Sequence, residues 1–144
     1  MIQLSPDTED DLWEPASGYE YADSSIIAFS LTHFSGTGIP DLGDIRFMPQ
    51  LGKPWLVQGP KSNPDSGYRA RFSHSDEMAG AGYYSIKLKD NNVRVETTAA
   101  DRSGMFRFTF PASDSASILV DLSRNLRWNV IWSKIRVEND STIS

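Results

Sequence analysis

The feature that most constrains the fold of this chain is the alternation of apolar and polar side chains with a period of two. Ile27, Phe29 and Leu31 alternate with small or polar neighbours, which is the spacing of a strand with one buried face. The chain then breaks at residues 35–38, Ser-Gly-Thr-Gly, because glycine adopts the positive φ values of tight turns. We therefore expect a strand that ends in a glycine-rich loop, followed by a second strand over residues 45–48.

The same alternation recurs along most of the chain. Residues 68–72, 84–88, 93–97, 106–110 and 118–122 each place apolar side chains, or in one case the β-branched Thr97, at every second position. The Asp-Asn-Asn turn between the second and third of these rows predicts a hairpin, and the arginines of the first row predict a strand with one basic face. Roughly eight or nine short strands at spacings of about 8–12 residues indicate an all-β fold, an antiparallel two-sheet β-sandwich.

The remaining segments are expected to be connections and ends. Residues 5–23 contain proline, glycine and an acidic run, which are typical of a long loop. Residues 52–67 read as a surface connection and residues 78–82 as a small-residue loop. The last strand is expected over residues 128–137, followed by a frayed polar tail at 138–144.

Length and charge exclude several classes of protein. The 144 residues fit a single domain, residues 1–144, and no apolar run approaches the ~20 residues of a membrane span. With 14 Lys+Arg against 19 Asp+Glu, the net charge of −5 argues against nucleic acid as a partner. The chain has no cysteine, so disulfides and thiolate metal sites are excluded. No signal peptide is recognisable in the sequence.

Motifs for catalysis are sparse. His33 and His74 are the only histidines, and two histidines without a nearby third ligand make a catalytic zinc site a poor interpretation. A nucleophile elbow, a phosphate-binding loop and a dinucleotide fingerprint are all missing. The sequence therefore gives no support to serine nucleophiles or nucleotide cofactors.

Loop carboxylates are the remaining candidates for acid–base chemistry. Glycoside hydrolysis usually needs two carboxylates that flank the scissile bond, and the pairs available in loops are Asp41 with Asp44 and Asp76 with Glu77. The first pair follows a proline and a glycine, where aspartate commonly caps turns through its own backbone. We therefore assign neither a catalytic residue nor a metal ligand to this chain.

Six short words stand in order along the chain. They are SGYEY at 17–21, FSLTHFSGTG at 29–38, PDLGDI at 40–45, RFSH at 71–74, AGYYS at 81–85 and FRFTFP at 106–111. Together the words resemble the N-terminal domain of glycoside hydrolase family 92, whose members are calcium-dependent exo-α-mannosidases that act in N-glycan degradation. The resemblance covers nearly the whole chain.

The resemblance implies a galactose mutarotase-like supersandwich that packs on a larger helical barrel. It places the general acid, the general base and the calcium ion chiefly on that second domain, which follows beyond residue 144. The sandwich would then supply one wall of the mannose pocket. The wall candidates carried over by the resemblance are Trp13, His33, Ser35, Thr37 and Asp41.

The resemblance also implies partners and a location. The partners are mannose-containing glycans and the helical domain of the same protein, and an uncovered domain face would favour self-association. A periplasmic or secreted parent enzyme is implied. Leu31 and Phe106 stand where relatives often show histidine, which would make the local pocket less polar.

Two other interpretations of the residues stay open. The chain could act as a stand-alone carbohydrate-binding β-sandwich, because Trp13, Tyr19 and Tyr21 offer aromatic faces for sugar rings. It could also be a purely structural interaction domain. A helical region with two suitably placed acids in the parent gene would separate the mannosidase interpretation from both.

Overall fold

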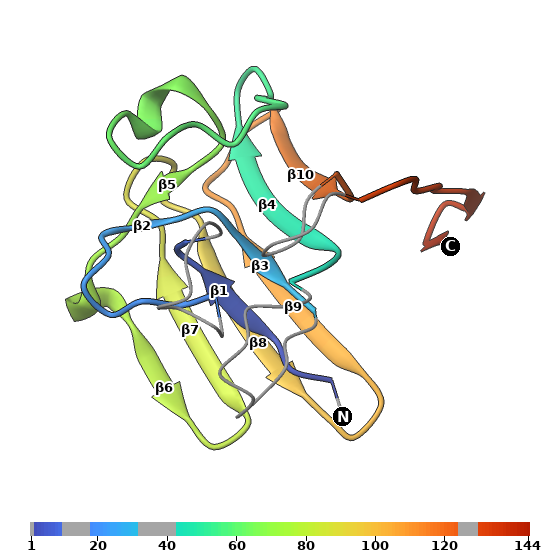
Figure 1. Cartoon of the computed structure of the whole chain (residues 1–144), viewed down its shortest axis with the longest axis horizontal. Helices are drawn as coiled ribbons and strands as arrows, with labels where there is room; N and C mark the ends of the chain where they lie inside the picture. The colour runs from blue at the N-terminus through green and yellow to red at the C-terminus, as the bar shows by residue number, and fades with distance from the viewer. Residues whose placement is uncertain (1, 10–17, 32–42, 124–129) are drawn as a thin grey trace.

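The computed structural model describes residues 2–9, 18–31, 43–123 and 130–144 (Figure 1). These residues form twelve β-strands and two short 3-10 turns, with no α-helix among them. In chain order the elements are β1 (Ser5–Asp7), β2 (Ser25–Ile26), β3 (Ala28–Ser30), β4 (Arg46–Leu51), η1 (Pro64–Ser66), β5 (Ala70–Arg71), η2 (His74–Asp76), β6 (Met78–Gly80), β7 (Tyr83–Lys87), β8 (Arg94–Ala99), β9 (Gly104–Thr109), β10 (Ala116–Asp121), β11 (Val137–Asn139) and β12 (Thr142–Ile143). The all-β prediction is confirmed.

One sheet is a meander in which β6, β7, β8 and β9 pair in chain order, all antiparallel. We call it the meander sheet. Ile86 on β7 lies opposite Val95 on β8, and both are fully buried. Asn92 has φ 57° in the turn between these strands, so the predicted hairpin is confirmed. The prediction of a loop at 78–82 is wrong in part, because β6 pairs its backbone with β7 at an exposed edge where no apolar row is needed.

The second sheet has the order β1-β3-β4-β10 and joins segments that lie far apart in the sequence. We call it the long-range sheet. The predicted strand with one buried face is wrong here, because Ile26, Ile27, Ala28, Phe29 and Ser30 are all fully buried. The strand also divides in two, since β2 pairs with β5 whereas β3 pairs with β1 and β4. This segment therefore passes through the centre of the molecule instead of bordering it.

The two sheets pack face to face as a sandwich, with β1 and β3 in front of the meander sheet in Figure 1. Phe29 on β3 and Phe47 on β4 lie opposite each other in register. Both reach Phe106 of β9, with ring centroids 6.5 and 5.3 Å away. Phe106 stacks in turn on Phe108 at 5.9 Å. Phe106 therefore belongs to the apolar contact between the sheets, where an aromatic ring contributes beyond its buried area.

Three further expectations need correction. The basic face of the row at 68–72 is exposed only in part, because Arg69 is buried and bonds to the backbone of Thr8 whereas the Arg71 side chain is 40% exposed. The loop expected at 5–23 contains strand β1, which pairs with β3. Residues 130–136 form no strand, whereas the expected frayed tail forms the hairpin β11–β12. Residues 128 and 129 of the predicted last strand lie outside the described residues.

Candidate functional site

The five predicted sugar contacts fall in two segments of the chain. Trp13 belongs to residues 10–17, and His33, Ser35, Thr37 and Asp41 belong to residues 32–42; both segments lie outside the described residues. Their role in binding sugar therefore stays a prediction. The residues that flank the two segments are described, and their contacts show how the fold holds the ends of both.

The ends of segment 32–42 are joined by a short backbone contact. The N–H of Leu31 donates to the carbonyl oxygen of Asp44 at 3.3 Å. Beyond Asp44, Ile45 has φ 53°, a left-handed conformation that is sterically costly for a β-branched side chain. Such strain persists only where the surrounding structure enforces it, so the entry into β4 is tightly constrained.

A buried arginine supports this entry. Arg46, the first residue of β4, is fully buried and donates from Nε to the carbonyl oxygen of Gly43 at 3.2 Å. The same Nε lies 3.7 Å from Oδ2 of Asp7, which is also fully buried. Ser30 donates its hydroxyl to Oδ1 of Asp7 at 3.2 Å. We call Asp7, Ser30, Gly43 and Arg46 the Arg46 network; it connects β1, the end of β3 and the start of β4.

A second carboxylate lies beside Arg46 in the sheet. Asp121 of β10 is the register partner of Arg46, and Tyr68 donates its hydroxyl to Oδ2 of Asp121 at 2.7 Å. Burial raises the pKa of Asp121, but hydrogen bonds from Ser123 and Tyr68 and the charge of Arg46 outweigh burial and hold the pKa below its usual range. Arg46 therefore has a carboxylate on each side.

The ends of segment 10–17 are joined in a similar way. The N–H of Thr8 donates to the carbonyl oxygen of Gly18 at 2.7 Å, and the N–H of Glu20 donates to the Thr8 hydroxyl at 2.8 Å. Arg69 donates from Nη1 to the carbonyl oxygen of Thr8 at 2.9 Å and to the Ser25 hydroxyl at 3.2 Å. The described residues next to the two segments thus belong to neighbouring, buried polar networks.

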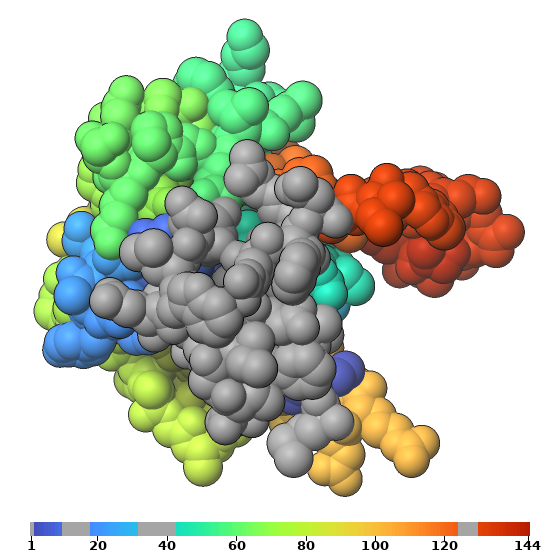
Figure 2. All heavy atoms as spheres, in the orientation of Figure 1, coloured from blue at the N-terminus to red at the C-terminus, as the bar shows by residue number. Residues whose placement is uncertain are grey.

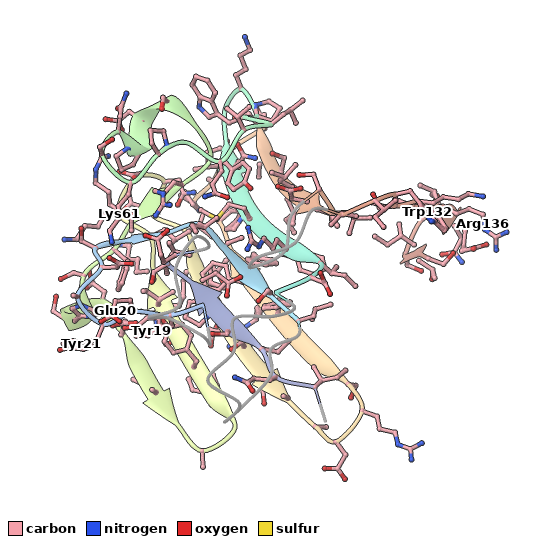
Figure 3. All side chains as sticks on the ribbon, in the orientation of Figure 1. Tyr19, Glu20, Tyr21, Lys61, Trp132 and Arg136 are labelled. Atoms are coloured by element: carbon pink, nitrogen blue, oxygen red, sulfur yellow. The ribbon has the colours of Figure 1, made fainter. Side chains whose placement is uncertain are left out.

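A cluster around Glu77 holds the chain that follows segment 10–17. Tyr19 donates its hydroxyl to both carboxylate oxygens of Glu77 at 3.1 and 3.2 Å, and Tyr84 donates to Oε1 at 2.6 Å. Nδ1 of His74 lies 2.5 Å from Oε2. The His74 ring stacks on Tyr21 with centroids 4.1 Å apart; Tyr19, Glu20 and Tyr21 lie together at the left of Figure 3.

The environment of the Glu77 cluster alters the titration of both tyrosines. Burial, and then the hydrogen bond and negative charge of Glu77, raise the pKa of Tyr19 and of Tyr84 above the ordinary tyrosine range. Tyr19, His74 and Tyr84 all contact the Glu77 carboxylate. Because Tyr84 lies on β7, these contacts join residues 18–21 to the meander sheet. This geometry favours an anchoring role for Glu77 and not a role as acid or base.

The described residues do not form a metal cage. Within the described ranges, no three side chains of His, Cys, Asp or Glu gather closely enough to hold an ion, and calcium takes about six to eight oxygen ligands. In the same part of the chain, no helix has the length and apolarity to cross a membrane. The described geometry therefore offers a polar support for the ends of segments 10–17 and 32–42.

Comparison with known proteins identifies the class of protein to which this support belongs. The model of the glycosyl hydrolase family 92 N-terminal domain matches residues 1–144. The chain belongs to glycoside hydrolase family 92. It spans a small part of the family 92 enzymes of known structure, and among curated proteins no match was found.

Solved structures of family 92 enzymes share this fold. The family GH92 α-mannosidase BT3965 from Bacteroides thetaiotaomicron, in complex with mannoimidazole, is 50% identical with a TM-score of 0.95; the match covers 99% of this chain and 19% of that enzyme. The family GH92 glycosyl hydrolase ccman5 is 31% identical with a TM-score of 0.65, over 86% of this chain and 17% of that one. The inverting mannosidase BT2199 from Bacteroides thetaiotaomicron VPI-5482 is 26% identical with a TM-score of 0.65, over 84% and 15%.

The residues that hold the ends of segments 10–17 and 32–42 are not apparent from the sequence. Asp7 lies within the loop expected over residues 5–23, and Arg46 lies within the strand expected over residues 45–48. A usable signal was the position of Arg46 between Ile45 and Phe47, since an arginine within an apolar strand needs a buried partner. The partner, Asp7, lies far from Arg46 in the sequence, so no local pattern connects the two residues.

Proposed function

We propose that this chain is the single N-terminal domain of an α-mannosidase that hydrolyses terminal α-linked mannose, and that it contributes one wall of the substrate pocket. The observation that carries this proposal is the 50% identity to BT3965 over 99% of this chain, since that α-mannosidase was solved with mannoimidazole bound. We assign the wall contacts to Trp13, His33, Ser35, Thr37 and Asp41. Mannose-containing glycans are the proposed substrates.

In this proposal the chemistry lies outside this chain. The match covers only 19% of BT3965, so the remaining polypeptide has room for the general acid and base. Inverting glycosidases separate these carboxylates by about 6.5–9.5 Å to admit a water molecule, and the relative BT2199 is an inverting mannosidase. Calcium is assigned to the remaining polypeptide as well, because the described residues do not fit a calcium cage; we derive no step through it.

The contribution of this chain is to position the wall. The Arg46 network and the Thr8 contacts fix the ends of segments 32–42 and 10–17 to strands of one sheet. A wall held by buried groups keeps its orientation when sugar binds, and a displacement of about 1 Å can cost about 100-fold in rate. The aromatic ring of Trp13 would stack on the apolar face of a sugar. A periplasmic or secreted parent enzyme completes the proposal.

The test compares this chain with the full-length polypeptide encoded by its gene. Mannose release is measured from an aryl α-mannoside and from an α-linked disaccharide, with calcium and with chelator. We expect turnover by the full-length protein and none by this chain, because a general acid or base contributes ~10²–10⁴-fold only within hydrogen-bond reach of the reacting atoms. Calcium-dependent turnover by this chain that disappears in Asp41→Ala or Asp44→Ala would overturn the assignment of catalysis to the remaining polypeptide.

A further inference from the structure

Lys61 contacts the described residues on both sides of segment 10–17. Its Nζ lies 3.5 Å from Oε2 of Glu9, the last described residue before the segment. It forms a second ion pair with Oδ1 of Asp23, which follows the segment. Figure 3 shows Lys61 on the same side of the molecule as Glu20. One side chain from the connection between β4 and β5 therefore joins the chain before the segment to the chain after it.

The carboxylate of Asp23 depends on a nearby cation. Asp23 is only 3% exposed, and its Oδ2 is buried without a hydrogen-bond partner among the described residues. A buried carboxylate is unfavourable unless its charge is compensated, and the ion pair with Lys61 compensates it. The hydrogen bond to Asp23 raises the pKa of Lys61 above its ordinary value and outweighs the lowering by burial. Lys61 therefore stays charged at neutral pH.

The connection that carries Lys61 is itself closely held. The N–H of Tyr68 donates to the carbonyl oxygen of Val57 at 2.8 Å. A Cβ atom at Gly67 would lie 2.3 Å from the backbone nitrogen of Gly59, so the chain before the loop lies against the chain after it. Figure 2 shows the green atoms of this connection against the blue atoms of the N-terminal part of the chain. Lys61 therefore projects from a fixed backbone, and its ion pairs can fix the residues that they contact.

We infer that Lys61 is a positioning residue for the wall: it holds the two ends of segment 10–17 together and so sets where Trp13 meets the sugar. This inference rests on the proposed function, in which Trp13 is a wall contact. The hydrogen bond between Thr8 and Gly18 joins the same ends to each other. Lys61 adds a charged link from both ends to the connection between β4 and β5.

A positioning role and a purely structural role give different kinetics. A displaced wall weakens the binding of the sugar, which raises KM and leaves kcat to the catalytic groups elsewhere. A destabilised enzyme contains fewer active molecules, which lowers the apparent kcat at an unchanged KM. The direction in which the two constants change therefore separates the two roles.

The first experiment measures hydrolysis of an aryl α-mannoside by variants of the full-length polypeptide. Lys61→Met should raise KM about tenfold with kcat changed less than about threefold, since a displacement of 1 Å can cost about 100-fold. Lys61→Arg should restore KM to within about twofold of the wild-type value, because a guanidinium can pair with the same carboxylates.

Two further variants serve as controls in the same assay. Lys53→Met removes an exposed lysine from the same connection and should leave KM unchanged. In an Asp23→Asn background, Lys61→Met should change KM less than about twofold, because the partner through which Lys61 acts has lost its charge. The first control tests whether loss of any lysine has the effect, and the second tests the assigned partner.

A second experiment does not depend on mannose release. The N–H groups of Thr8 and Glu9 both donate to the carbonyl oxygen of Gly18, at 2.7 and 3.3 Å. Amide hydrogen exchange at these two groups in the full-length polypeptide should be about tenfold faster in Lys61→Met than in Lys53→Met, because local opening no longer has to break the ion pairs.

Two results would contradict the inference. The first is an unchanged KM in Lys61→Met, whether or not kcat falls. The second is unchanged exchange at Thr8 and Glu9 in the same variant. If the full-length polypeptide releases no mannose, the proposed function fails, and the exchange measurement alone decides whether Lys61 holds the ends of segment 10–17.

Discussion

The meander sheet and the long-range sheet both bury side chains between them, but they differ in how many polar groups they bury. In the meander sheet, strands that follow one another in sequence pair directly, and Ile86 and Val95 are buried while Tyr83 and Lys87 are exposed. In the long-range sheet, β1, β3, β4 and β10 come from distant parts of the chain. Both faces of β3 are buried, and one of them carries the Arg46 network.

This difference shows where the fold depends on polar contacts. A strand with one solvated face needs only apolar residues on the other face. A strand buried on both sides must find a partner for each polar group, because an unpaired buried charge costs several kcal/mol. The long-range sheet should therefore be sensitive to the loss of single polar groups, and the meander sheet should respond mainly to lost apolar volume.

The largest effect is expected from Arg46→Met. This change leaves the buried carboxylate of Asp7 without its cation, and breaking a buried ion pair typically costs about 3–5 kcal/mol of unfolding free energy. Urea denaturation followed by circular dichroism measures the loss. The double variant Arg46→Met/Asp7→Leu should lose less than Arg46→Met alone, because the fully buried carboxylate is then removed and only the partly buried Asp121 loses its neighbouring cation. A loss below about 1 kcal/mol in Arg46→Met would show that the two sheets do not differ in this way.

A smaller effect is expected where the Glu77 cluster joins residues 18–21 to the meander sheet. Glu77→Gln turns one acceptor oxygen into a donor that faces other donors, and an unsatisfied buried group costs about 1–3 kcal/mol. Urea denaturation again measures the loss. A neutral result in Glu77→Gln would mean that the cluster does not connect the two parts of the molecule.

Alkaline titration tests the same cluster by a second measurement. The pKa of Tyr19 and of Tyr84 is raised in the folded state, so the stability they contribute is fully present below about pH 10, the ordinary tyrosine pKa, and is lost as the pH rises above it. Ultraviolet difference absorbance at 295 nm should show these two tyrosines ionising above the ordinary tyrosine range. In Glu77→Gln both should ionise earlier, and an unchanged titration would contradict the assigned cause.

A third prediction compares apolar packing in the two regions. Ile86→Val in the meander sheet and Ile27→Val beside the long-range sheet each remove one methylene from a fully buried side chain. Each should cost about 0.5–1.5 kcal/mol, measured as a shift in the urea midpoint. Similar losses would show that the sheets share their apolar packing and differ only in polar contacts. A much larger loss of stability in Ile27→Val would show that the two sheets also differ in how sensitive they are to lost apolar volume.

The smallest effect is expected on the solvent face of the meander sheet. Hydrogen bonds from Arg107 and then Tyr83 lower the pKa of Glu96 to about 2. A carboxylate with a lowered folded-state pKa contributes stability above its unfolded pKa, which is about 4.3, and loses it as the pH falls toward 2. Glu96→Gln should therefore flatten the stability profile between about pH 4.5 and 2. Because Arg107 is largely exposed, salt should reduce the difference, and a salt-independent difference would contradict this explanation.

Local patterns predicted the meander sheet well and the long-range sheet poorly. Asn92 and the apolar rows on either side of it located the β7–β8 hairpin, because hairpin register depends on residues that are close in sequence. The division of residues 25–30 between β2 and β3 left no such signal. Neither did the strand β1, since Ser5–Asp7 carries a proline and a buried aspartate that read as loop residues.

The candidate site shows the same limit. The family resemblance indicates Trp13 and His33, but no local pattern marks the groups that hold the ends of their segments, among them Asp7, Arg46 and Thr8. Asp76 and Glu77 could be nominated as carboxylates from sequence. The convergence of Tyr19, Tyr84 and His74 on Glu77 was needed to favour an anchoring role.

The sequence by itself determined the all-β class, the β7–β8 hairpin and the family to which the chain belongs, because alternation and family words are properties of neighbouring residues. Tertiary structure alone decided that Arg46 meets Asp7, that β3 is buried on both faces, and that Ile131 and Trp132 are exposed. The physical reason is that the burial of a charge or of an indole depends on which distant segments pack around it, and a period of two specifies a face without specifying what covers that face.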